Sequence, residues 1–208
     1  MASNQHRSAG RRRPGRRSFA AHWEGLAAAD FFTVEVLTLR GVVRYVVLFV
    51  MKLKTRTVEI VGITSEPDGG WMTQLARNLT DPSEGFLRGV QYIILDRDPL
   101  YTVAFRRLLR DSGVKPLVLP AWSPNLNAFA ERFDESAKSE CLERMVLLGE
   151  SHLRAAVRAF IDHYHEERPH QGLDNELIAP TTTEVGTGPI TCRERHGGLL
   201  KFYCREAA

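Results

Sequence analysis

AAADFFTVEVLTLRGVVRYVVLFVM, residues 27–51, is the stretch that decides the fold. Residues 27–39 are rich in β-branched and aromatic side chains, and residues 42–51 are almost continuously apolar. Arg40 and Gly41 between them form a plausible turn. The pattern predicts an antiparallel hairpin whose second strand is covered on both faces of its sheet.

The rest of the chain extends this hairpin into an α/β architecture. A third strand follows at residues 55–63, and the apolar residues of 72–79 have helical spacing after a Pro-Asp-Gly-Gly breaker. A strand, a helix and a second strand then form a βαβ unit, and two more helices follow. The predicted fold class is α/β, a mixed five-stranded sheet flanked by helices. Beyond residue 64 the predicted strands are 92–95 and 116–119, and the helices are 100–112, 125–147 and 150–167.

Composition limits the cellular class of the protein. The longest apolar run, residues 42–51, is interrupted by Arg44 and is too short to span a membrane. The first 22 residues hold six arginines and no acid, and they lack the apolar segment of a secretory signal. Three widely separated cysteines indicate neither a disulfide framework nor a zinc site. We therefore expect a cytoplasmic protein with no membrane partner.

The charge distribution predicts three regions. The chain has 28 Lys and Arg against 25 Asp and Glu, and removing the six arginines of residues 1–22 leaves a net charge of −3. Residues 1–22 are expected to be a disordered basic tail. Residues 23–180 are expected to form the core domain, and residues 181–208 a C-terminal extension.

Three acids occupy positions suited to chemistry. Asp30 lies inside the first strand, and Asp96 directly follows the strand of residues 92–95. Glu131 borders the apolar stripe of the helix predicted at 125–147. Carboxylates from these three elements can hold Mg²⁺ or Mn²⁺, because hard cations prefer oxygen ligands. Position alone leaves the alternative open that each acid is simply salt-bridged or solvated.

The wording around these acids resembles the integrase catalytic core of bacterial insertion-sequence DDE transposases, a superfamily that includes retroviral integrases. The matching words are ADFFTVE, ILDRDP, PNLNAFAERF with AKSECL, and the closing HYHEERPHQGL. The resemblance implies a ribonuclease H-like fold. It also assigns the three catalytic, metal-binding acids to Asp30, Asp96 and Glu131. Between the first two lie 65 residues and between the second pair 34, and the family usually has about 34 to 35 in the second interval.

The same resemblance implies a function. It predicts a metal-dependent enzyme that binds two Mg²⁺ or Mn²⁺ ions, cleaves transposon DNA ends and joins them to target DNA, acting as a homo-oligomer on DNA. Lys138, Asn127 and Arg132 are the predicted DNA-binding residues. The competing interpretations are a ribonuclease H-like nuclease that only hydrolyses, and a non-catalytic remnant of a mobile element that binds DNA weakly. Only about 29 residues precede Asp30, which is too few for the helix-turn-helix region of related transposases, so we expect a core fragment.

Several assignments have alternatives in the sequence. Asp98 could replace Asp96 as the ligand, although Asp98 followed by Pro99 also fits a helix N-cap, and the resemblance favours that division of roles. Lys138 is either a phosphate contact or a solvated charge. Asp134 and Glu135 add negative charge beside the expected DNA path and favour an inactive remnant. The histidines at 163, 165 and 170 indicate a hydrogen-bonded helix end rather than a metal site.

Overall fold

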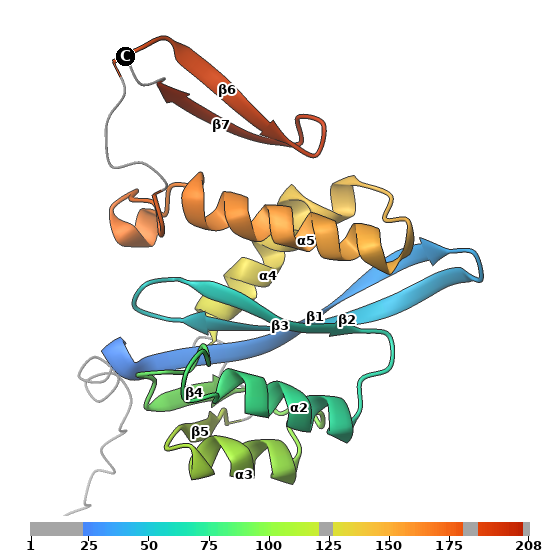
Figure 1. Cartoon of the computed structure of the whole chain (residues 1–208), viewed down its shortest axis with the longest axis vertical. Coiled ribbons are helices and arrows are strands. Elements are labelled where there is room, and N and C mark those ends of the chain that lie inside the picture. The colour runs from blue at the N-terminus through green and yellow to red at the C-terminus, as the bar shows by residue number, and fades with distance from the viewer. Residues whose placement is uncertain (1–22, 121–126, 181–186, 206–208) are drawn as a thin grey trace, which may run out of the picture.

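A mixed sheet of five strands forms the centre of the protein (Figure 1). The computed structural model describes residues 23–120, 127–180 and 187–205. The strand order is β3-β2-β1-β4-β5, with β1, β2 and β3 antiparallel and with β4 and β5 parallel to β1. This confirms the predicted α/β class and sheet. The strands are β1 (Leu26–Thr38), β2 (Gly41–Lys52), β3 (Val58–Thr64), β4 (Tyr92–Leu95) and β5 (Lys115–Val118).

The predicted hairpin is β1 and β2, paired from Thr38 and Gly41 at the turn. Gly41 has a φ of 106°, a conformation that a side chain would disfavour, so the turn needs a glycine. Alternate β2 residues face opposite sides of the sheet, and both Leu48 and Phe49 are completely buried. The nearly continuous apolar sequence of β2 is therefore explained by cover on both faces.

Two helical layers provide that cover (Figure 1). One apolar cluster joins one face of the sheet to α4 and α5, and a second cluster joins the other face to α2 and α3. At Gly62 in β3 a Cβ atom would lie 2.8 Å from the Trp71 ring, so glycine permits the close approach of α2. The helices are α2 (Gly69–Leu79), α3 (Val103–Asp111), α4 (Ala128–Glu140) and α5 (Gly149–Glu166), with short 3-10 turns η1 (Trp23–Gly25), η3 (Leu142–Arg144) and η4 (Gln171–Leu173).

Two helix boundaries differ from the prediction. The prediction of Asp98 as the N-cap of α3 is wrong, because the Thr102 side chain accepts the cap hydrogen bond from the Phe105 N–H at 3.1 Å. Asp98 instead accepts from the Leu100 N–H at 2.8 Å in the preceding turn. The helix predicted to reach residue 147 ends at Glu140, and its predicted first residues, 125 and 126, lie outside the described parts of the chain.

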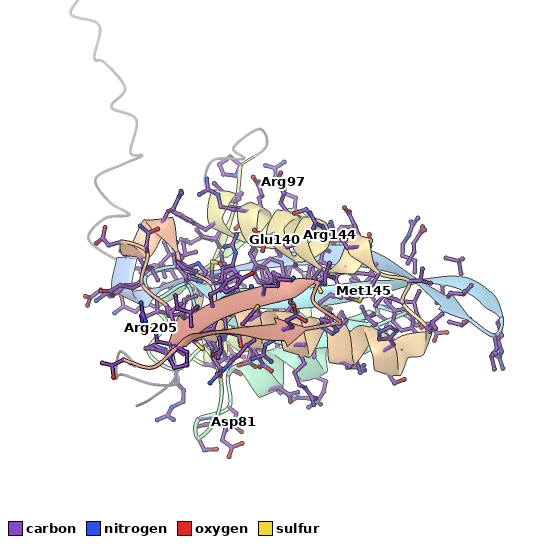
Figure 2. All side chains as sticks on the ribbon, turned by 90° about the horizontal axis from the view of Figure 1, so that it is seen from above. Asp81, Arg97, Glu140, Arg144, Met145 and Arg205 are labelled. Atoms are coloured by element: carbon purple, nitrogen blue, oxygen red, sulfur yellow. The ribbon has the colours of Figure 1, made fainter. Side chains whose placement is uncertain are left out.

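The C-terminal region contains a hairpin that the sequence did not predict. β6 (Ile190–Arg195) and β7 (Leu200–Arg205) pair antiparallel as a separate two-stranded sheet. The two views place it over the outer side of α5 (Figures 1 and 2). Leu200 is buried in the α4–α5 cluster, and Arg195 forms ion pairs with acids of α5 and Glu167. The predicted basic tail, residues 1–22, lies outside the described residues.

Across the three described segments, no helix has the length and apolar character needed to cross a membrane.

Candidate active site

Asp30 lies within β1 on the face of the sheet that α4 covers. Its neighbours on that face, Ala28 and Phe32, belong to the α4–α5 apolar cluster. Its carboxylate accepts hydrogen bonds from the Phe31 N–H at 2.8 Å and from Nδ2 of Asn127 at 3.0 Å. The second bond joins the strand to the first residue before α4 and confirms that Asp30 faces this helix.

Asp96 lies beside Asp30 because of the strand register. β1 and β4 are parallel, with Ala28 opposite Ile94, and Asp30 and Asp96 each follow two residues later. The two-residue period of a strand directs both side chains to the same face. The Asp96 carboxylate accepts from the Asp98 N–H at 3.1 Å. The predicted pair of neighbouring acids is therefore present at the carboxyl ends of parallel strands.

The electrostatics of the site oppose negative charge on Asp30. Burial raises the pKa of Asp30 to about 7, against an ordinary 3.8, and the charges of Asp96, Asp134 and Glu131 raise it further while the Phe31 N–H opposes them. Burial, and then the charge of Asp98, also raise the pKa of Asp96. This pattern is typical of acids held close together in a site that binds cations.

One side of α4 faces these acids. Residues 127, 131, 134 and 138 follow helical spacing and lie on one side of the helix. Glu131 is exposed in the first turn of α4, whereas Asn127 is buried and bonded to Asp30. Lys138 forms an ion pair with Asp134 at 2.9 Å, with its ammonium 5.8 Å from the ring centre of Phe32. Lys138 is thus occupied by an acid within the site rather than freely solvated.

The chemistry of these side chains fits a hard divalent cation. The donors are carboxylate oxygens, and the buried Oδ1 of Asn127 has no hydrogen-bond partner among the described residues. Within residues 23–120, 127–180 and 187–205, however, no three His, Cys, Asp or Glu side chains are grouped closely enough to hold a metal ion. The metal site formed by Asp30, Asp96 and Glu131 therefore stays a prediction.

Two further residues belong to this site although the sequence did not assign them to it. Asp134 was expected only as unfavourable charge near DNA, yet its charge acts on Asp30 and its carboxylate pairs with Lys138. Tyr101 is buried against Phe31, with ring centres 4.9 Å apart, and no hydrogen-bond partner of its hydroxyl lies in the described parts of the chain. Helical spacing from Glu131 is the sequence signal that could have identified Asp134, but no pattern marks Tyr101.

The histidine-rich segment after α5 is a hydrogen-bonded helix end, as predicted. His163 Nδ1 lies 2.9 Å from a Glu167 oxygen, and His170 Nε2 lies 2.7 Å from the Tyr164 carbonyl oxygen. His165 Nε2 accepts from the Val58 N–H at 3.0 Å, which joins this helix end to β3. These contacts account for all three rings without a metal.

Sequence comparison identifies two relatives of this region. Residues 112–176 match the family model described as an integrase core domain. A stretch of 70 residues is 33% identical to an uncharacterized 31.7 kDa protein of insertion element IS407 from Burkholderia multivorans. That match covers 34% of this chain, and the chain spans 24% of the relative's length.

Structure comparison places the fold among integrases. The catalytic core domain of BIV integrase has a TM-score of 0.52 and 13% identity, over 72% of this chain and 88% of that one. A chain of the simian T-cell lymphotropic virus intasome, solved with PP2A regulatory subunit B56 gamma, has a TM-score of 0.53 and 11% identity, over 88% and 67%. Together with the family match, this ribonuclease H-like fold confirms the resemblance drawn from the sequence: the chain carries a DDE transposase or integrase core.

Proposed function

We propose that this chain is the catalytic core of a metal-dependent DNA transposase that cleaves DNA ends and transfers them to target DNA. The observation that carries the proposal is the pair Asp30 and Asp96, side by side on parallel strands and facing the helix that bears Glu131. Transposon ends and target DNA are the proposed partners, and the protein acts as a homo-oligomer on DNA.

Asp30, Asp96 and Glu131 would hold two Mg²⁺ or Mn²⁺ ions in this mechanism. Such ions activate the attacking oxygen, first of water and then of a DNA 3′-hydroxyl, and neutralise charge on the phosphodiester. The protein's own residues orient the ligands: Asn127 and the Phe31 N–H each hold one oxygen of Asp30. The Asp98 N–H holds Asp96 in the same way.

The test compares Asp96→Asn with Asp98→Asn, because the two residues lie in one turn and the substitutions make equal changes in charge. Asp96→Asn should abolish Mn²⁺-dependent cleavage of terminal DNA, a loss of about 10³-fold or more, while Asp98→Asn should reduce it far less. The reverse result would assign the ligand to Asp98. Equal, full activity in both variants would overturn the proposal.

A substrate with pre-cut 3′-hydroxyl ends and a plasmid target distinguishes the proposal from a nuclease that only hydrolyses. A transposase core joins these ends to the plasmid, and a nuclease does not. The Asp134–Lys138 ion pair favours a second candidate, a weakly binding inactive remnant, because it removes a free cation from the site. A protein that binds DNA but neither cleaves nor joins it would support that second candidate.

A further inference from the structure

A cavity of about 350 Å³ opens on the side of α4 that faces away from the carboxylates. α4 contributes Phe129, Arg132 and Ser136, which are spaced on one side of the helix. Arg56 comes from the turn between β2 and β3, and Arg168 from the segment after α5. The cavity thus brings three guanidinium groups from separate elements to one place.

The lining is cationic and incompletely neutralised. It includes three arginines and a histidine, and none of its described residues is acidic. Arg168 is neutralised by Glu140, with Nη2 and Oε1 2.7 Å apart. Within the described parts of the chain, neither Arg56 nor Arg132 forms an ion pair with an acid. Two positive charges therefore remain available at the cavity.

Arg56 shows most directly that an anion is missing from this arrangement. Its Nη1 is buried without a hydrogen-bond partner among the described residues, which is costly for a charged group. Its guanidinium carbon lies 3.5 Å from the ring centre of Phe129 and 5.7 Å from that of Trp23, so the aromatic rings fix its position. Burial, and the nearby charge of Arg132, lower the pKa of Arg56, while Tyr164 opposes them.

We propose that this cavity binds a phosphate group of the DNA backbone between Arg56 and Arg132. Guanidinium forks match phosphate oxygens, and a phosphate would satisfy the unpaired Nη1. Arg132 directly follows Glu131, so the bound phosphate would lie across α4 from the reacting one. That DNA supplies the phosphate rests on the proposed function, whereas the anion site itself does not.

The experiment measures binding of a fluorescein-labelled DNA duplex to the full chain by anisotropy at several KCl concentrations, with EDTA present. Chelation removes any binding through metal at the carboxylates. Arg132→Gln should weaken binding on the order of tenfold and reduce the salt slope by about one. Arg107→Gln is the matched control, because Arg107 is exposed on α3, on the other side of the sheet, and loses the same charge.

Arg56 gives a second variant pair. Arg56→Gln should weaken binding as Arg132→Gln does, and Arg56→Lys, which keeps the charge, should keep the salt slope while losing part of the affinity. Because Arg56 is packed on Phe129, melting temperatures accompany these measurements, and Arg132→Gln on the exposed surface of α4 decides the result if Arg56 variants unfold. Equal affinity and slope in Arg132→Gln and Arg107→Gln would overturn the proposal.

A second arm identifies the source of the phosphate. Arginine side-chain N–H resonances are followed by NMR while inorganic phosphate or the duplex is added to the metal-free protein. Shifts at Arg56 and Arg132 with the duplex support the proposal. Shifts with inorganic phosphate alone would contradict a DNA site and indicate a small-anion site. Since neither arm measures catalysis, failure here is distinguishable from failure of the Asp96→Asn cleavage test.

Discussion

Asp30 accepts two hydrogen bonds and yet lies in an environment that is unfavourable for its charge. An acid whose folded-state pKa is raised to about 7 binds a proton in the native state that the unfolded chain releases near pH 4. Its unfavourable effect on stability is therefore absent below about pH 4 and grows as the pH rises through 7. Divalent cations that bind the folded protein would offset this effect above pH 7.

The first prediction follows from this sign. Asp30→Asn should raise the free energy of unfolding by about 2 kcal/mol near pH 8 and leave it almost unchanged near pH 4, measured by urea denaturation without metal. The amide introduced at position 30 can donate to the partnerless Oδ1 of Asn127 after the Asn127 side chain rotates, so the contact between β1 and α4 is kept. A loss of stability at both pH values would contradict this account of Asp30.

Asp134 supports a second prediction at the scale of one residue. Asp134→Asn removes the acid that pairs with Lys138 and frees a cation beside the site. Binding of a DNA duplex should tighten about threefold to tenfold, and its salt slope should steepen by about one. Glu135→Gln on the exposed side of α4 removes the same charge and is the control. Equal gains in both variants would show only a change in net charge.

Tyr101 supports a third prediction. Its buried hydroxyl has no partner among the described residues, and burial together with the charges of Asp30, Asp96 and Asp98 raises its pKa well above the ordinary value. Tyr101→Phe should therefore keep the ring contact with Phe31 and stabilise the fold by about 1 kcal/mol in thermal or urea denaturation. Destabilisation of that size would mean that the hydroxyl has a partner in solution.

At the scale of elements, local pattern predicted the hairpin and the βαβ unit, and tertiary contacts changed the helix ends. The sequence after Glu140 continues with helix-forming residues and has no Gly or Pro before Gly149. The chain nevertheless leaves the helix, because the Leu147 carbonyl accepts from the Leu37 N–H of β1 at 2.9 Å and Leu148 forms a bridge to Leu37. Such a pairing depends on distant residues, so helical spacing could not reveal it.

The β6–β7 hairpin was missed for a related reason. Four of the six β6 residues are exposed, and Leu200 is the one buried residue of β7, so neither strand has a clear apolar alternation. Its attachment depends mainly on Arg195, which bonds Glu167 through two nitrogens at 2.9 and 3.0 Å. Burial alone would raise the pKa of Glu167, but the hydrogen bonds from Arg195 and His163 lower it.

The hairpin supports the fourth prediction. Arg195→Gln leaves the buried Glu167 with His163 as its remaining cationic partner, and should lower the free energy of unfolding by about 2 kcal/mol near pH 7. Because an acid with a lowered pKa stabilises above its unfolded value, the loss should shrink as the pH falls toward 4. Adding Glu167→Gln to the same chain should recover part of the stability. A loss independent of pH would exclude the ion pair as its cause.

At the scale of the whole molecule, sequence reasoning located the acids better than the cations. Asp30 and Asp96 were predictable as neighbours because parallel strands bring their carboxyl ends to one edge of a sheet. The cavity was not predictable, since Arg56, Arg132 and Arg168 are far apart in the chain and meet only through the packing of α4 and α5. Asn127 was predicted to bind DNA, yet it is buried and holds Asp30.

The last prediction concerns the balance between the basic tail and the rest of the chain. Without the six arginines of residues 1–22 the remaining residues carry a net charge of −3, so most general attraction to DNA must come from the tail, while the cavity supplies local contacts. Deleting residues 2–22 should flatten the salt slope of duplex binding by several units, measured by anisotropy. A tail that only neutralises phosphates gives no sequence preference, so terminal and scrambled DNA should weaken equally. A preference of about 10³-fold or more for the terminal sequence, kept after the deletion, would show that the core itself reads bases.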